Sequence, residues 1–204
     1  MKKLCFVLTL GLVFGFSSIA TAQFGGTSKP KKLGLGANGG LFRVSLNVFD
    51  DAYGERWGGA AGAHASYRFG RTFNALVKYR QFSKSADPQR DNVGAAREWK
   101  ENWVNVGVRY MGWKSRGAGS YLSIGLTFFQ VDEQGPSSII PGNFGEVGES
   151  NHSGFFLDLG VNYKLMEYIA LNFEAEITSA NVGGLETTSI GGLFASVGLT
   201  IFPF

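Results

Sequence analysis

The chain has 204 residues, a formal net charge of +3, 30 glycines and one cysteine. The length predicts a single domain, the small charge gives no reason to expect nucleic-acid binding, and one cysteine excludes an intrachain disulfide or a multi-cysteine metal site. Glycine is about twice as frequent as in average proteins. Together with abundant phenylalanine and only 5 prolines, this composition indicates an all-β fold.

Residues 1–22 have the three parts of a secretory signal peptide. Two lysines form a basic start, residues 4–16 form an apolar centre, and Ala-Thr-Ala at residues 20–22 is a small-residue cleavage site. A membrane anchor is the alternative, but the apolar run is short for one. We expect cleavage near Ala22, which leaves residues 23–204 as the folded domain. Cleavage removes Cys5 and two lysines, so the net charge falls to about +1.

Strict alternation of apolar and polar residues recurs through the rest of the chain. In residues 154–164, Phe155, Leu157 and Leu159 alternate with polar or small residues. Alternation with a period of two predicts β-strands with one apolar and one polar face. Eight segments follow this pattern: 33–46, 59–69, 72–82, 102–113, 120–131, 154–164, 169–178 and 188–204.

Three local features depart from a simple series of regular strands. Arg43 falls in an apolar stretch of the first segment, which predicts a bulge or kink at residues 39–40. Residues 93–101 can form one or two helical turns ahead of the fourth segment. Phe202 and Phe204 lie on the opposite parity from the apolar row of the last segment, so we expect a bulge just before them or a different phase for that strand.

Long and short connections alternate between the eight segments. The long ones are residues 47–58, 83–101, 132–153 and 180–187. Outer-membrane barrels have an even number of strands, short periplasmic turns and longer outer loops, and closure leaves no unpaired edge in lipid. The sequence therefore predicts an all-β fold, an eight-stranded antiparallel up-and-down transmembrane β-barrel with both termini in the periplasm.

In such a barrel the apolar parity faces lipid and the polar parity fills the narrow interior. The alternative is a soluble lipocalin-like barrel, which closes in the same way but is apolar inside. The loop pattern favours the membrane barrel. Aromatic residues near the strand ends are typical of interfacial girdles: Tyr67, Phe73, Tyr79, Tyr110, Trp113, Tyr163 and Tyr168.

The strand pattern, the loop pattern and the terminal aromatic residue resemble the small porin-family barrels of Gram-negative bacteria, such as outer-membrane proteins A, X and W. The resemblance covers the mature chain and implies a place in the bacterial outer membrane. It also implies that Phe202 and Phe204 form an assembly signal, read by the barrel-assembly machinery through strand addition. Pro203 lacks a backbone donor, which is tolerable at a strand end.

Six charged residues on the polar parity form the candidate functional site. They lie on strands three, four, six and seven: Lys78, Arg80, Arg109, Asp158, Glu174 and Glu176. Strands three and seven are opposite in an eight-strand ring, so their charges can meet across the lumen. Charges held out of lipid need partners, and such a network can act as a structural plug or as the gate of a narrow conductance. We favour the plug.

The sequence offers little support for catalysis. His64 and Ser66 share a face, but that face points inward, and the adjacent residues His152 and Ser153 diverge in a strand. We therefore expect no enzyme activity, no cofactor and no metal site.

The leading interpretation is a monomeric structural or surface-interaction barrel with a charged, plugged lumen and its loops exposed outside. Its expected partners are outer-membrane lipid, lipopolysaccharide and a surface ligand or envelope protein. Two alternatives stay open. One is a narrow channel for small or apolar solutes, which the resemblance to outer-membrane protein W allows, and the other is a lipid A-modifying hydrolase.

Overall fold

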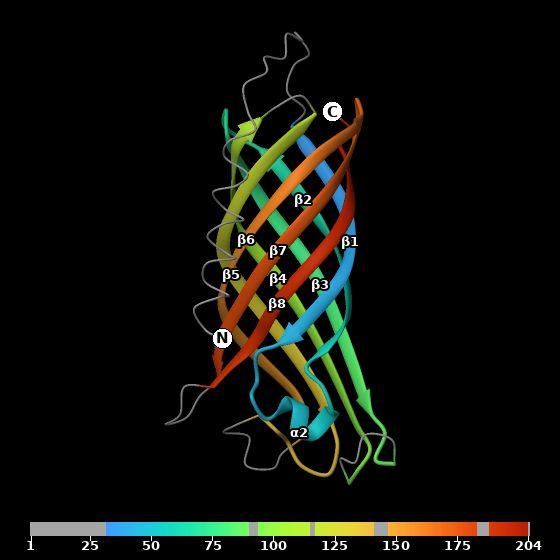
Figure 1. Cartoon of the computed structure of the whole chain (residues 1–204). Coiled ribbons are helices and arrows are strands. Elements are labelled where there is room, and N and C mark those ends of the chain that lie inside the picture. The colour runs from blue at the N-terminus through green and yellow to red at the C-terminus, as the bar shows by residue number, and fades with distance from the viewer. Residues whose placement is uncertain (1–31, 90–93, 115–116, 141–146, 183–187, 204) are drawn as a thin grey trace, which may run out of the picture.

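The computed structural model describes residues 32–89, 94–114, 117–140, 147–182 and 188–203, and these residues form a closed antiparallel barrel of eight strands (Figure 1). Each strand pairs with its neighbours in chain order, and β1 pairs with β8 to close the ring. The strands are β1 (Leu33–Val44), β2 (Trp57–Arg68), β3 (Phe73–Ala86), β4 (Arg97–Lys114), β5 (Ala118–Gln134), β6 (Gly148–Met166), β7 (Ile169–Val182) and β8 (Thr188–Ile201). This architecture confirms the predicted fold class.

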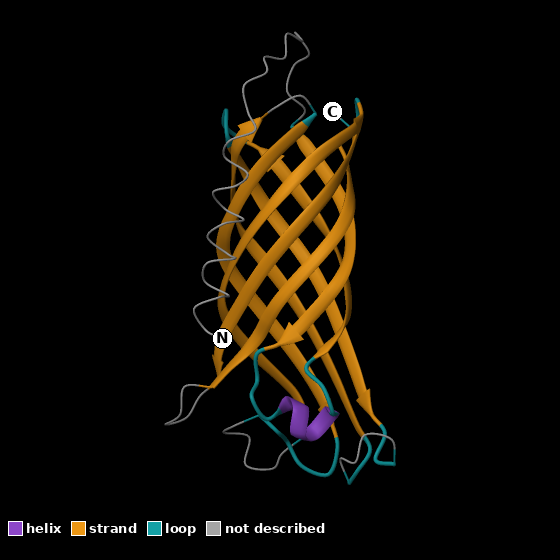
Figure 2. Ribbon diagram, in the orientation of Figure 1, coloured by secondary structure: helices purple, strands orange, loops and turns teal. Residues whose placement is uncertain are grey.

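The two ends of the barrel differ in their connections. The short turns after β2, β4 and β6 lie at the end where β1 begins and β8 finishes, and we call it the turn end. The long connections lie at the other end, the loop end, where the short helix α2 (Phe49–Tyr53) sits beside the barrel opening (Figure 2). In the predicted orientation the turn end is periplasmic. Among the described residues, no helix is long and apolar enough to cross a bilayer.

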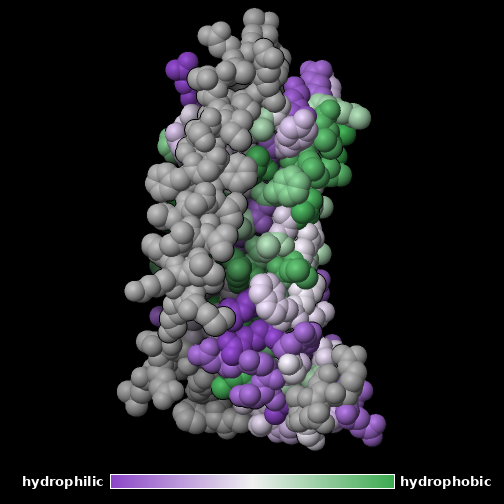
Figure 3. Space-filling model, viewed as in Figure 1, coloured by the Kyte–Doolittle hydropathy of each residue, from purple (hydrophilic) through white to green (hydrophobic). Residues whose placement is uncertain are grey.

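The outward face of the barrel is an apolar band with a polar edge. Along β5, Leu122, Ile124, Leu126 and Phe128 are all exposed, and the next outward residue is Gln130. The outward row also changes from apolar to polar at Gln81 on β3 and at Asn102 on β4. Asn102 pairs with Gln81 on one side and with Gln130 on the other, so the three residues lie at the same level of the barrel. An apolar wall around a charged interior is the arrangement of a membrane barrel and the reverse of a soluble one. In Figure 3, hydrophilic residues gather towards the loop end of the visible face.

Aromatic side chains mark the boundaries of this band. Six of the predicted girdle residues are exposed: Tyr67, Phe73, Tyr79, Tyr110, Tyr163 and Tyr168. The side chain of Trp113 lies outside the described part of the structure. Tyr79 lies at the polar edge, where its hydroxyl donates to Oδ1 of Asn102 over 3.0 Å. The others lie towards the turn end, as expected for an interfacial girdle.

The predicted bulge at residues 39–40 is wrong. Strand β1 pairs without a register shift with both β2 and β8. Arg43 stays on the outward row above the apolar band and lies over the ring of Trp57, 5.9 Å from its centroid. Phe42 and Val44 face inward and are fully buried. The alternation seemed to break because the inward row becomes apolar near the loop end.

The end of β8 differs from the prediction in another way. The strand stops at Ile201, with its apolar row outward as predicted, and its pairing with β1 and β7 shows no register shift. The expected bulge is therefore absent from the described part of β8. Phe202 lies beyond the strand, near Gly34 on the inward side, and its backbone N–H donates to the carbonyl of Tyr168 over 2.8 Å. Phe204 lies outside the described residues.

Several strands extend further towards the loop end than predicted. Strand β4 begins at Arg97, so the helical turns expected over residues 93–101 are wrong for residues 97–101; residues 90–93 lie outside the described part. Cross-strand pairing of β3 with β4 continues from Phe73 to Ala86. The backbone hydrogen bonds between neighbouring strands continue through these extensions, although the side chains there are largely polar. The predicted signal peptide also lies outside the described residues.

Candidate functional site

All six predicted interior charges point into the barrel and meet in one cluster. Lys78 on β3 donates to Oε1 of Glu174 over 2.9 Å, to Oε2 of Glu176 over 2.8 Å, and to Asp158. Arg80 donates to Oε1 of Glu174 over 2.9 Å. The backbone pleat explains this convergence, because all these residues lie on the inward parity of their strands and β3 stands opposite β7 in the ring.

Glu174 is the most connected member of the charge cluster. Its Oε2 accepts from Arg109 over 3.1 Å and from the hydroxyl of Tyr121 over 3.0 Å. The guanidinium of Arg109 lies over the ring of Tyr121, 3.8 Å from its centroid. A Cβ atom at Gly160 would fall 2.2 Å from Cζ of that ring. Glycine at this inward position therefore leaves the space that Tyr121 needs.

Neutral side chains extend the hydrogen bonding of the charge cluster. Oε1 of Glu176 accepts from Nε1 of Trp103 over 3.1 Å and from Nδ2 of Asn105 over 2.8 Å. Nε of Arg109 donates to the hydroxyl of Ser123 over 3.0 Å. Sequence reasoning missed these partners. They share the inward parity with the charged residues, which is the one signal that could have identified them.

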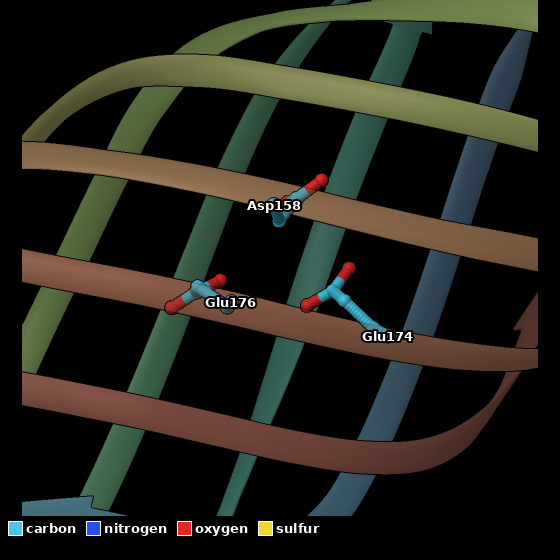
Figure 4. Close-up of side chains that lie close together, drawn as sticks. All are labelled: Asp158, Glu174 and Glu176. Atoms are coloured by element: carbon cyan, nitrogen blue, oxygen red, sulfur yellow. The ribbon is translucent and has the colours of Figure 1, made fainter. Parts of the chain in front are cut away.

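The three acids of the cluster also have the geometry of a cation site. Asp158, Glu174 and Glu176 each offer an oxygen, and these oxygens lie within 4.8 Å of one another (Figure 4). The ammonium of Lys78 is within hydrogen-bonding distance of all three carboxylates. Together with Arg80 and Arg109, it balances three negative charges with three positive ones. Since a side chain already supplies the central cation, we assign no metal to this cluster.

A second cluster, the aromatic plug, fills the loop end of the barrel. It contains rings from β1, α2, β3, β4, β5 and β8: Phe42, Phe49, Tyr53, Phe82, Trp99, Trp103, Phe129 and Phe194. Helix α2 inserts two of them, Phe49 and Tyr53, whose stacked rings both contact Trp99. Phe49 lies 5.3 Å from Trp99 in an edge-to-face arrangement, which is favourable for aromatic pairs. Sequence reasoning expected only a loop here.

Polar contacts hold α2 in place. Arg56 donates to both carboxylate oxygens of Asp50, over 2.7 Å and 3.0 Å, and this hydrogen bonding lowers the pKa of Asp50. Lys84 on β3 donates to Glu55 over 2.5 Å. Gly54 ends the helix in the left-handed region, with φ of 77°. Burial raises the pKa of Tyr53 well above its usual value.

The turn-end half of the interior is polar and largely uncharged. Nε2 of His64 lies 3.1 Å from the hydroxyl of Thr200, and Asn38 donates to Ser196 over 3.0 Å. Side chains there keep a small exposed fraction, 9% for Asn38 and 7% for His64, whereas Lys78 has none. Solvent therefore reaches part of this half but not the centre of the charge cluster.

The structure does not assemble a catalytic triad from the histidines and serines of its described part. His64 and Ser66 both face inward, and His64 contacts Thr200 rather than Ser66. His152 does contact a serine, but it is Ser150, with Nε2 and Oγ 3.1 Å apart. This pair was not predicted. It lies on the inward parity of β6, and among the described residues no carboxylate hydrogen-bonds the second ring nitrogen.

Comparison with solved structures gives the class of fold. The chain superposes on Neisserial surface protein A with a TM-score of 0.61 at 15% identity, covering 83% of this chain and 96% of that one. It superposes on the N-terminal β-barrel domain of Pseudomonas aeruginosa OprF with a TM-score of 0.52 at 14% identity, covering 85% and 98%. For Ail, the attachment invasion locus protein of Yersinia pestis, the values are 0.51, 12%, 84% and 100%.

These matches, the closed ring and the apolar outer wall define the fold as that of the small eight-stranded outer-membrane β-barrels. The similarity extends over nearly the whole length of each of these barrels. No protein-family model and no curated protein sequence matches the chain.

Proposed function

We propose that this protein is a non-enzymatic barrel of the bacterial outer membrane, with a closed lumen and with its outer loops as the contact surface for other molecules. The observation that carries the proposal is the filled interior. The charge cluster closes the middle of the barrel, and the aromatic plug closes its loop end. Neither cluster leaves its central side chains exposed to solvent.

The apolar band and the girdle support the proposed contact with outer-membrane lipid, and the polar edge at the loop end supports contact with lipopolysaccharide headgroups. One fold neighbour is named a surface protein, Neisserial surface protein A, and another is named for attachment and invasion, the attachment invasion locus protein of Yersinia pestis. We extend that kind of role to this chain as a monomer, assembled by the barrel-assembly machinery through Phe202 and Phe204.

Planar-bilayer recording tests the closed lumen. The refolded protein should show no channel events above the background of protein-free bilayers, since the charge cluster is electrically balanced and its central side chains are buried. A variant pair, Lys78→Met and Lys100→Met, separates the lumen from the surface. The closed-lumen proposal would be overturned if the unmodified protein gave regular single-channel steps whose conductance changed in Lys78→Met but not in Lys100→Met. The charge cluster would then act as a gate and not as a plug.

A narrow channel is the second candidate function, and one observation favours it. Glu174 is the acid through which Lys78, Arg80 and Arg109 are joined, and its side chain keeps an exposed fraction of 3%, the largest of the three acids in the charge cluster. A carboxylate that solvent reaches can exchange partners, and such exchange would open a path past Arg80. The same recordings decide between the two functions.

The hydrolase is the weakest alternative. Among the described residues, its one supporting contact is that of Ser150 with His152, which has no orienting acid in that part of the chain and lies on the inward row. Mass spectrometry of lipid A from cells with and without the gene should show identical acylation. Loss of an acyl chain that depends on Ser150 would establish the enzyme instead.

A further inference from the structure

One buried acid at the loop end has no charged partner. Glu101 on β4 is fully buried, between Phe82 and Val131 of the neighbouring strands. Its Oε2 accepts from Nε1 of Trp99 over 3.1 Å, whereas its Oε1 has no hydrogen-bond partner and the carboxylate forms no ion pair among the described residues. A carboxylate without compensation in such surroundings is costly. It calls for an explanation beyond packing.

The surroundings of Glu101 are aromatic. Trp99 and Phe82 flank it, and the buried rings of Phe49 and Tyr53 on α2 pack against Trp99. Burial raises the pKa of Glu101 to about 7, which indicates that no cation offsets its charge. Lys100 and Asn102 on either side of it point outward and are polar, so Glu101 lies at the polar edge of the lipid-facing band, on its loop-end side.

Helix α2 fills this aromatic site but gives the carboxylate of Glu101 no hydrogen bond among the described residues. The hydroxyl of Tyr53 is also buried, without a hydrogen-bond partner in the described part of the chain. The helix therefore covers the aromatic site while leaving two polar oxygens unpaired, Oη of Tyr53 and Oε1 of Glu101. The residue after the C-cap of the helix, Glu55, forms an ion pair with Lys84 of β3, and the side chain of Glu55 is 65% exposed. The docked helix is therefore stabilised mainly by the packing of its buried rings, and these are contacts that an apolar ligand can replace.

Other acids at the same end are satisfied. Glu133 is equally buried, but it accepts from the hydroxyl of Ser138 over 2.6 Å and from the backbone N–H of Ile139 over 2.7 Å. Arg97 lies 3.9 Å from it. The contrast shows that the unpaired state of Glu101 is a local property and not a general feature of the loop end.

From this arrangement we propose that the aromatic plug is a binding site for an organic cation, an ammonium group with an apolar body, which enters from the loop end when α2 undocks. Aromatic faces attract a cation and carry no competing hydrogen-bond donors, and Glu101 supplies the opposite charge. The apolar body of the ligand replaces Phe49 and Tyr53 against Trp99. The inference is independent of whether the lumen conducts.

Benzyltrimethylammonium is a suitable probe, and neopentylbenzene is its uncharged analogue of the same shape. Calorimetric titration of the full mature protein in lipid nanodiscs should give saturable binding of the cation, one per chain, and no binding of the uncharged analogue. Glu101→Gln should weaken binding at least about tenfold, because a buried charge pair is lost. Glu133→Gln should bind within about twofold of the unmodified protein.

Lys84→Met tests the role of α2. Loss of the tether to Glu55 should strengthen binding, since less of the ligand's binding energy is spent on undocking, and the substituted residue lies outside the aromatic plug. Equal binding by Glu101→Gln and the unmodified protein would overturn the proposal. So would equal binding of the uncharged analogue, or no binding by either the unmodified protein or Lys84→Met.

Discussion

Lys78 on β3 lies 2.8 Å from Oε2 of Glu176 on β7, although these two strands are on opposite sides of the ring. The contact spans the lumen, so one ion pair joins the two halves of the barrel wall. Both side chains are completely buried. In this environment each charge depends on the other, because neither can be hydrated.

Lys78→Met should therefore destabilise the barrel by about 3–5 kcal/mol, since it leaves three carboxylates facing two guanidinium groups. The double substitution Lys78→Met with Asp158→Asn restores the balance of charge and should be less destabilising than the single one. Urea unfolding in lipid vesicles measures both. Lys100→Met is the exposed control, with an expected change within about 0.5 kcal/mol. A double variant less stable than the single one would contradict the argument from charge balance.

Two arginine substitutions on the same outward row of β5 test the lipid-facing band. Ile124→Arg places a charge in the middle of the band and should cost about 2–4 kcal/mol, whereas Gln130→Arg lies at its polar edge and should cost about 0–1 kcal/mol. Ile124 is 62% exposed, so steric conflict does not confuse the result. Unfolding free energies in lipid provide the measurement. Similar costs at the two positions would mean that the wall does not face lipid.

The stability of the loop end should depend on pH through Glu101. Its pKa is about 7 in the folded state against 4.5 as the ordinary value, so the folded protein holds this proton more tightly than the unfolded chain. Stability from this group is complete below pH 4.5, falls as pH rises towards 7, and levels off above that; the total loss is about 3 kcal/mol.

Other carboxylates titrate in the same range, so the informative quantity is the difference between the unmodified protein and Glu101→Gln. As pH rises from 4.5 to 7.5, the unmodified protein should lose unfolding free energy relative to Glu101→Gln, because only the glutamate becomes charged. A difference that is constant with pH would show that Glu101 is not buried as an uncompensated acid.

Docking of α2 can be tested at Phe49. Phe49→Ala removes the ring that packs edge-to-face on Trp99, and such core truncations cost about 3–5 kcal/mol where the ring stays buried. The helix should undock, and the indole N–H of Trp99 should exchange with solvent at least about tenfold faster, as followed by NMR. Val48→Ala changes the preceding, exposed residue and should leave the exchange rate unaltered.

Much of the architecture could be predicted because lipid imposes two strict requirements on a membrane-spanning strand. Every outward residue of the band must be apolar and every backbone group must be paired, so the alternation from Leu122 to Phe128 identifies both the strand and its outward face. The meeting of Lys78 with Glu174 followed from parity and ring order alone. The structural or gating role of that cluster, like the signal peptide and the assembly signal at Phe204, remains a prediction.

The sequence alone determined the eight strands, their order and the side that faces lipid, because the period of two is a local property imposed by the solvent on each face. Only the tertiary structure decided what fills the loop end of the barrel. Phe42 seemed out of phase until it met Phe82 and Trp103 from other strands, and the five residues of α2 form a helix that docks there against Trp99. Contacts between residues so distant in the chain leave no local pattern, since their partners become neighbours only when the ring closes.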